Sequence, residues 1–281
     1  MCRHWLARGD RDYAKCPRCQ TAHMTNPPRS AELKDLYSNT VFTLPGNDQY
    51  YEDDPTNLAA ARARRRWVER SVSSGRLLDI GCGCGHFLAV LNSRRWSAQG
   101  IDISPLAVRR ARQRFNVRCE ARPFAELPDS WRGCFDAVTM WDVIEHVPDP
   151  FAALSGAASM LRPGGSLFLS TPDISAIAAR MLGKRWHYID PMQHLCLFSR
   201  DSLIQLCART GLQAARSRPF GRSYTLGYLL YRVGYCFPIP GLRAAASASA
   251  RVLRSMRDLS VPIMLGDIVG LEAVKPAREV T

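Results

Sequence analysis

The sequence predicts an α/β fold in which a mainly parallel β-sheet carries helices on both faces. From Arg76 onward, apolar segments of strand length alternate with segments of helical period, which is the pattern of a parallel sheet with crossover helices. The first of these strands, Arg76–Ile80, runs directly into a glycine-rich loop that opens a helix. At 281 residues, the chain can hold one large domain, or one large and one small domain.

The individual elements follow from the same pattern. Ser104 and Pro105 open the helix after the second strand, as N-cap and first-turn residue, and Gly211 ends the last helix. The expected strands are 76–80, 98–101, 117–119, 135–140, 166–171, 213–218 and 267–274. The expected helices of the main domain cover 56–71, 86–94, a segment from 104 onward, 150–161 and 199–210, and residues 162–165 are expected to form a turn.

The chain divides into an N-terminal segment and a main domain. Residues 1–55 show little periodicity apart from a short helix at 30–37, for which Ser30 is the expected N-cap, and they end in an acidic linker. Residues 56–281 form the main domain. Within it, residues 222–264 are rich in Leu, Tyr and Ala and are predicted to be a helical insertion before the last strand.

The formal charge of +13, from 38 Lys and Arg against 25 Asp and Glu, is high for an ordinary globular protein. Arg accounts for most of it, in two runs at 62–66 and 109–114. Such a field favours nucleic acid, an anionic membrane or a phosphorylated substrate as a partner. No basic motif with interleaved aromatic residues accompanies it, so we interpret the runs as solvated helix faces and expect no stable nucleic-acid partner.

The cysteines and the apolar segments bear on the compartment. Ten cysteines are scattered along the chain, several of them inside apolar runs, as expected for buried thiols in a reducing environment. The first residues lack the layout of a signal peptide. The longest apolar stretch, near 226–240, is shorter than the ~20 apolar residues that span a bilayer. We therefore expect the protein to be cytoplasmic.

The loop Gly81-Cys82-Gly83-Cys84-Gly85, called the glycine loop below, is the first candidate ligand site. Glycine is needed where the backbone turns sharply and approaches a ligand closely. The spacing differs from the Gly-x-Gly-x-x-Gly of dinucleotide sites. Asp79, just before the loop, would repel a pyrophosphate but suits a cationic ligand with an amino-acid end. Asp102 ends the second strand, about 20 residues after the glycines, where an acidic side chain commonly holds ribose hydroxyls.

Two further motifs follow in order, Glu145-His146-Val147-x-Asp149-Pro150 and Leu161-Arg162-Pro163-Gly164-Gly165. With the glycine loop and Asp102, they make residues 70–220 resemble the class I S-adenosylmethionine (SAM)-dependent methyltransferases. More narrowly, the chain is similar to the small-molecule branch related to the ubiquinone-pathway O-methyltransferases. The resemblance implies SAM as the cofactor and a Rossmann-like seven-stranded sheet whose last strand is antiparallel.

The resemblance also implies which residues hold the cofactor. It places Asp79 and the glycine loop around the methionine part, Asp102 on the ribose, and Trp141 and Asp142 beside the cofactor after the fourth strand. The stretch 121–127 lacks the Asp that often meets the adenine amino group, so the adenine contact is unassigned. The expected cofactor-binding residues are Asp79, Gly81, Cys82, Gly83, Gly85, Asp102, Ile103, Trp141 and Asp142.

Candidate catalytic residues lie in the segment 184–195, after the fifth strand. Ligands of this fold bind at the carboxyl ends of the strands, so this segment should face the reacting end of the cofactor. It contains His187 and His194, and His is the base best matched to neutral pH. In the similar enzymes, a His-Leu pair stands where His194 does, although His194 could instead brace the next helix. His146 is a third candidate, but different chemistries share its motif, which favours a structural role.

Cys16 and Cys19 have the spacing of half a structural zinc site, which needs four ligands. Many similar enzymes begin with a zinc knuckle of two Cys-x-x-Cys pairs. Here the first pair is missing, although Cys2 and His4 lie near its place. We assign no metal ligand.

The predicted function is the transfer of a methyl group from SAM to a small-molecule acceptor, preferably a hydroxyl, either free or linked to a lipid or a glycan. Enzymes that methylate exocyclic amines of nucleic acids carry Asn/Asp-Pro-Pro-aromatic after the fourth strand, where this chain has Trp141-Asp142. A nucleic-acid (RNA) methyltransferase and a non-catalytic SAM-binding protein are the alternatives. Residues 224–264 could cover the acceptor pocket or contact a membrane, but we favour packing of their apolar side chains in the core. The sequence does not indicate the oligomeric state.

Overall fold

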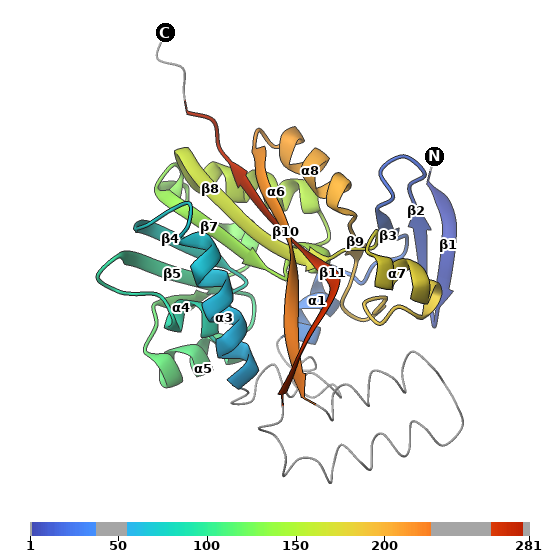
Figure 1. The fold of residues 1–281 in the computed structure, drawn as a ribbon, viewed down its shortest axis with the longest axis horizontal. Helices are drawn as coiled ribbons and strands as arrows, with labels where there is room; N and C mark the ends of the chain where they lie inside the picture. Colours follow the sequence, from blue (N-terminus) through green and yellow to red (C-terminus); the bar gives the residue numbers. More distant parts are fainter. Residues whose placement is uncertain (1, 38–54, 226–259, 278–281) are drawn as a thin grey trace.

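The computed structural model describes residues 2–37, 55–225 and 260–277. Its main sheet has seven strands (Figure 1). β11 is antiparallel to both of its neighbours, whereas the five strands from β8 to β6 are mutually parallel. The predicted Rossmann-like sheet with an antiparallel last strand is confirmed. In sheet order the strands are β10 (Gln213–Thr225), β11 (Ser260–Val274), β8 (Leu161–Pro172), β7 (Phe135–Trp141), β4 (Gly75–Ile80), β5 (Trp96–Asp102) and β6 (Cys119–Ala121).

Helices cover both faces of this sheet, as predicted (Figure 1). One face carries α3 (Pro55–Val68), α4 (His86–Ala89) and α5 (Pro105–Phe115), whose inward side chains share a buried apolar cluster that includes Trp67, Phe87 and Val108. The opposite face carries α6 (Pro150–Met160) and α8 (Arg200–Arg209), which pack through a second cluster that includes Leu154 and Leu203. Burial of the sheet on both sides explains why its strands are apolar throughout.

Side-chain caps fix where three of the helices start. Ser104 Oγ accepts the Ala107 N–H at 3.3 Å and begins α5, as predicted. Asp149 caps α6 and Ser199 caps α8 in the same way. Each cap satisfies an otherwise unpaired N–H of the first turn. The remaining short helices are α1 (Ser30–Asp35), α7 (Ile177–Leu182) and the 3₁₀ turns η2 (Phe124–Glu126), η3 (Asp129–Trp131), η4 (Ile144–His146) and η5 (Gly183–Arg185).

The N-terminal segment forms a sheet of its own, so the expectation of little regular structure before residue 30 was wrong. The strands β1 (Arg3–Arg8), β2 (Arg11–Lys15) and β3 (Ala22–Met24) pair in order, and β3 also pairs with β9 (Cys196–Leu197). Short strands give almost no periodic signal, and β9 becomes a strand only by pairing with a segment far away in the sequence. The segment is therefore built onto the main domain.

Several helices and turns begin or end at other residues than predicted. The helix expected at 86–94 ends at Ala89. Shortly after it, the Asn92 side chain accepts the Arg94 N–H and forms a turn. Arg29, and not Ser30, occupies the N-cap position of α1. The turn expected at 162–165 belongs to the start of β8, because Gly164 and Gly165 bond to the backbone of Lys275.

The ends of the predicted insertion also differ. Residues 222–225 and 260–264, expected to be helical, extend β10 and β11 as an antiparallel pair. The rest of the predicted insertion lies outside the described residues. Within the described ranges, no helix combines the length and the apolarity that crossing a bilayer requires.

Candidate functional site

The glycine loop leaves the carboxyl end of β4 in a conformation that other residues rarely adopt. Gly81, Gly83 and Gly85 have φ angles of 72°, 51° and 80°. A Cβ on Gly81 would lie 2.4 Å from a methyl carbon of Val143, and one on Gly85 would lie 2.8 Å from the Ala111 Cβ. Both the left-handed backbone and the close approach of Val143, just after β7, and of α5 therefore require glycine.

Asp102 holds the loop in place from the end of β5. Its carboxylate accepts the Gly83 N–H and the Ser104 N–H, each at 2.8 Å. Each carboxylate oxygen keeps a further lone pair for a ligand hydroxyl. Burial raises the pKa of this carboxyl, although both backbone bonds oppose the rise. Ile103, the next residue, is half-buried.

Asp79 lies beneath the loop and is almost completely buried. Thr139 Oγ1 donates a hydrogen bond of 2.6 Å to it. Burial raises the pKa of Asp79 to about 7, although Thr139 and the positive charge of Arg64 oppose the rise. A cationic ligand at this edge of the sheet would favour the ionised form.

Arg64 on α3 reaches the carboxyl end of β7, and the sequence analysis missed it. Its guanidinium forms an ion pair of 2.6 Å with Asp142, which also accepts the Ser170 hydroxyl at 2.8 Å. The Arg run 62–66 was interpreted as a solvated face. A signal was present, because Arg64 lies on the same helical stripe as the buried residues Ala61 and Val68.

Trp141 lies within an aromatic cluster against α3. Its ring centroid is 6.0 Å from that of Trp67 and 5.3 Å from that of Phe87, and the Arg64 guanidinium lies 5.1 Å from its centroid. Its indole N–H is buried and has no hydrogen-bond partner among the described residues. A buried donor without a partner is costly, so a ligand acceptor at this point would be favourable.

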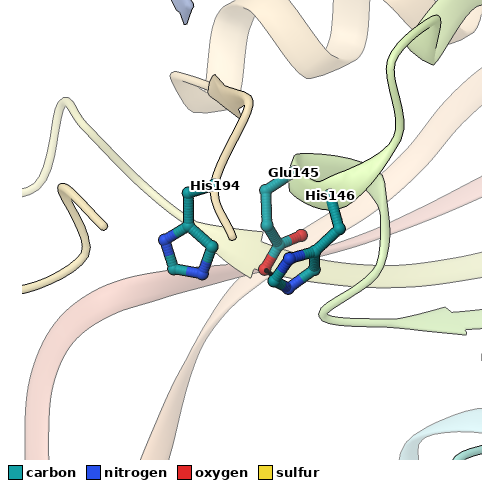
Figure 2. A group of neighbouring side chains, drawn as sticks. All are labelled: Glu145, His146 and His194. Carbon is teal, nitrogen blue, oxygen red and sulfur yellow. Dashed lines mark ion pairs between the residues drawn. The ribbon is translucent and has the colours of Figure 1, made fainter. Parts of the chain in front are cut away.

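Three side chains gather beyond the glycine loop, at the carboxyl ends of β7 and β8: Glu145, His146 and His194 (Figure 2). One ligand-type atom of each lies within 4.8 Å of the others. Glu145 is buried and accepts the Thr171 hydroxyl at 2.8 Å. Burial and the nearby Asp142 raise the pKa of Glu145 to about 7. We call these three residues the His–Glu cluster.

Backbone carbonyls orient both imidazole rings of the His–Glu cluster. His194 Nδ1 lies 2.6 Å from the Tyr188 carbonyl oxygen, and His146 Nδ1 lies 2.9 Å from that of Gln193. A carbonyl can only accept, so in the neutral His194 ring the hydrogen is on Nδ1 and the lone pair is on Nε2. Burial and the neighbouring His146 lower the pKa of His194, which favours this neutral form.

The N-terminal segment supplies two tyrosines that support the His–Glu cluster, and the sequence analysis missed both roles. The Tyr13 hydroxyl on β2 donates to the backbone carbonyl of His194 at 2.8 Å. The Tyr37 hydroxyl, just beyond α1, lies 2.9 Å from His146 Nδ1. Burial raises the pKa of Tyr37, so its hydroxyl remains protonated.

Comparison with known proteins assigns the chain to a family. A family model described as a methyltransferase domain matches residues 51–216. The chain belongs to this methyltransferase family. It is 36% identical over 186 residues to a ubiquinone biosynthesis O-methyltransferase of Xanthomonas axonopodis pv. citri strain 306, an alignment that covers 57% of this chain and 77% of that protein. The identity to the protein of the same name from Xanthomonas campestris pv. campestris strain B100 is 33%, over 50% of this chain and 67% of that one.

A solved structure shows the same fold. It is the 1,6-didemethyltoxoflavin-N1-methyltransferase of Burkholderia thailandensis, with bound 1,6-didemethyltoxoflavin and S-adenosylhomocysteine. The TM-score is 0.55 at 16% identity, with 98% of this chain and 99% of that chain covered. The predictions of a class I, SAM-dependent methyltransferase and of SAM as its cofactor are confirmed.

His187 lies apart from the His–Glu cluster of this methyltransferase. Its side chain is 7% exposed, and its Nε2 is 3.6 Å from Asp267 Oδ2 on β11. The Asp267 carboxylate also lies 3.5 Å from the Trp186 indole nitrogen. The structure therefore brings His194 and His146 together, whereas His187 forms a separate buried pair.

Among the described residues, the three side chains of the His–Glu cluster are close enough to hold a metal ion together. The carboxylate and two imidazoles of the His–Glu cluster are donors that divalent transition metals accept. In the N-terminal segment, backbone N–H groups of Cys19 and Arg18 and the thiol of Cys19 lower the pKa of Cys16 to about 7, with a further bond from Cys2. These residues include the Cys16-x-x-Cys19 half-site, to which we assign no metal.

Proposed function

We propose that this methyltransferase methylates a hydroxyl group of a small molecule, with His194 as the general base. The observation that carries the proposal is the bond from His194 Nδ1 to the Tyr188 carbonyl, because it leaves Nε2 as a proton acceptor. The O-methyltransferase names of the Xanthomonas relatives favour oxygen as the methylated atom.

The cofactor would lie along the carboxyl edge of the sheet. We assign the ribose hydroxyls to Asp102 and the amino-acid end to the glycine loop with Asp79 and Arg64, where Arg64 would hold the carboxylate. Cys82, Ile103, Trp141 and Asp142 remain proposed neighbours. When bound, SAM supplies a methyl group activated by a sulfonium for in-line displacement.

The carboxylates at this edge suit a positively charged cofactor. Asp79, Asp102 and Glu145 all have raised pKa values, and burial is the largest cause for each. A sulfonium and an ammonium group would offset the cost of ionising them. This complementarity is a second reason to place SAM here.

The chain's own residues would handle the proton of the acceptor. His194 Nε2 takes the hydroxyl proton as the acceptor oxygen forms its new bond. The carboxyl of Glu145, when ionised, stabilises the resulting imidazolium, since its charge raises the pKa of His194. The Tyr13 hydroxyl holds the backbone carbonyl of His194, and the Tyr188 carbonyl holds its ring at Nδ1, so the ring stays in position.

The acceptor class can be tested directly with purified protein. Incubation with methyl-labelled SAM and a panel of small phenols, aliphatic alcohols, amines and carbon acids should give labelled product with hydroxyl compounds. Transfer to amines alone, or to RNA alone, would contradict the proposal. Treating the protein with a chelator before the assay shows whether transfer also needs a divalent metal at the His–Glu cluster.

Tyr37 should act as a positioning residue for His146. Tyr37→Phe removes one of the two groups at His146 Nδ1. Because the His146 ring packs against the ring of the proposed base His194, with centroids 4.8 Å apart, we expect kcat to fall roughly 2- to 10-fold, the equivalent of the ~0.5–1.5 kcal/mol of one hydrogen bond. KM for SAM should not change. Nitrogen-15 NMR of the imidazoles should show a changed His146 signal.

Tyr13→Phe is the matched control, because Tyr13 contacts the backbone of His194 and not the His146 ring. It should leave the His146 signal in place. An unchanged His146 signal in Tyr37→Phe would show that Gln193 alone orients the ring.

A further inference from the structure

Cys82 and Cys119 form a thiol pair directly beside the glycine loop. Cys82 lies within the loop, between Gly81 and Gly83, and Cys119 begins β6. Both side chains are buried and both cysteines are free thiols. The two thiols are close enough for each to shift the pKa of the other. The proposed methyl transfer does not require an interaction between these two thiols.

Gly100 makes the pairing possible. It lies opposite Cys119 in the parallel β5–β6 ladder, so the Cβ of Cys119 and a Cβ on Gly100 would point to the same face of the sheet. A Cβ on Gly100 would be 2.7 Å from both the Cβ and the Sγ of Cys82. The Cys82 side chain therefore occupies the space above Gly100, on the same face as its neighbour Cys119.

The surroundings favour a thiolate on one member of the pair. The Cys82 thiol and the Arg112 guanidinium lower the pKa of Cys119 to about 7, against the effect of burial. Arg112 is held there by a bond of 2.8 Å from its Nε to the Cys119 carbonyl. Cys82, in contrast, has its pKa raised by Cys119 and by burial. Cys119, beside Arg112, is therefore the member of the pair that ionises more readily, and Cys82 is the second thiol that can resolve its oxidised form.

We propose that Cys82 and Cys119 form a reversible disulfide under peroxide and that this bond weakens cofactor binding. The Cys119 thiolate attacks one oxygen of hydrogen peroxide and breaks the O–O bond, giving a sulfenic acid and hydroxide, which is protonated to water. The Cys82 thiol then attacks the Cys119 sulfur and displaces the second oxygen as water. Two thiols are oxidised to one disulfide and one peroxide is reduced to two waters.

The bond would distort the glycine loop. An S–S bond is about 2.05 Å long, shorter than any contact between non-bonded sulfur atoms, so the two side chains must approach each other. Gly83, the residue after Cys82, is tied to Asp102 by a hydrogen bond of 2.8 Å. Drawing Cys82 toward β6 changes the turn that Asp102 braces, and with it the proposed ribose contact. The inference rests on the proposed position of the cofactor and not on the acceptor.

The test measures binding of S-adenosylhomocysteine by calorimetry, before and after treatment with hydrogen peroxide, together with non-reducing peptide mapping. We expect a Cys82–Cys119 crosslink and a Kd raised at least ~10-fold, both reversed by dithiothreitol. Cys119→Ser should bind the ligand when reduced and keep its affinity after peroxide. Cys119→Ala serves if the serine variant fails to fold.

Cys207→Ser on α8 is the matched control, since Cys207 is buried on the opposite face of the sheet and should leave the response to peroxide intact. Oxidised protein without the crosslink, crosslinked protein with unchanged affinity, or a Cys119→Ser variant as sensitive as the wild type would each overturn the proposal. If the reduced protein does not bind S-adenosylhomocysteine, the proposed cofactor site fails, while peptide mapping still decides whether the disulfide forms.

Discussion

A His194→Gln variant is expected to lose about 10²- to 10⁴-fold in kcat, the usual contribution of a positioned general base. The amide of Gln can still donate to the Tyr188 carbonyl, so the loop should keep its structure. Gln has no basic nitrogen that could take the proton from the hydroxyl of the acceptor molecule. Binding of S-adenosylhomocysteine should not change, because His194 lies beyond the glycine loop. Rates are measured with an acceptor identified by labelled transfer.

His187→Gln is the matched control for this substitution, since His187 pairs with Asp267 outside the His–Glu cluster. Its kcat should remain within a few-fold of the wild type. If His187→Gln lost the activity and His194→Gln kept it, His187 would be the general base and the assignment of His194 would be wrong.

The pH dependence gives a separate check on His194. Because burial and His146 lower its pKa, the ring is unprotonated at neutral pH and becomes protonated only below its ordinary value of about 6.5. The rate should therefore fall as pH decreases below that value and be independent of His194 above it. A phenol acceptor with a low pKa should depend less on the base, and its rate should fall less in His194→Gln.

An Asp79→Asn variant should make the cofactor-free protein more stable at pH 8 while weakening SAM binding. The pKa of Asp79 is about 7 in the folded protein, above its ordinary value of 3.8, so folding favours the protonated carboxyl. The unfolded chain is already ionised between these values, and the stability cost therefore grows as pH rises from about 4 to about 7. Asn removes this cost and keeps an oxygen for the Thr139 hydroxyl.

The expected gain above pH 7 is about 1–3 kcal/mol in the free energy of unfolding, somewhat below the ~4 kcal/mol that a full three-unit shift implies. It should diminish as pH decreases toward 4, because the carboxyl is protonated in the folded protein and becomes increasingly protonated in the unfolded chain as well. Urea unfolding of both proteins at pH 5 and pH 8 measures this difference. Equal stability at pH 8 would contradict the raised pKa.

Cofactor binding by Asp79→Asn should show the opposite trend. Wild-type affinity for SAM is expected to rise between pH 6 and pH 8, as Asp79 ionises beside a cationic ligand. The Asn variant should bind SAM more weakly and lose this pH dependence. Asp136→Asn is the matched control, since Asp136 is the second residue of the neighbouring strand β7 and pairs with Arg162, at the opposite end of the strand from the site. It should leave SAM binding unchanged.

Much of the sheet and of the glycine loop could be predicted from the sequence because their signals are local. An apolar strand, a loop of three glycines and a helix cap such as Ser104 are readable within a few residues, since backbone sterics and the first helical turn determine them. Asp102 was predictable because its distance from the loop is set by a single strand–helix–strand unit.

The supports of the site were decided only by the tertiary structure. Arg64 contacts Asp142, Tyr37 contacts His146, and Tyr13 contacts the His194 carbonyl. Each of these pairs joins residues far apart in the chain, and the sequence gives no local sign of which partner will fold against which. For the same reason, the sequence did not predict β9, a two-residue strand that forms only by pairing with β3.

The sequence by itself determined the fold, the family and the position of the glycine loop, because these depend on short-range geometry and on motifs in a set order. The tertiary structure decided that His194 and His146 share a cluster with Glu145, that His187 lies apart with Asp267, and that Cys82 faces Cys119 over Gly100. These groupings depend on packing across the sheet, where the partner of a buried polar group is selected by proximity in space and not by spacing in the chain.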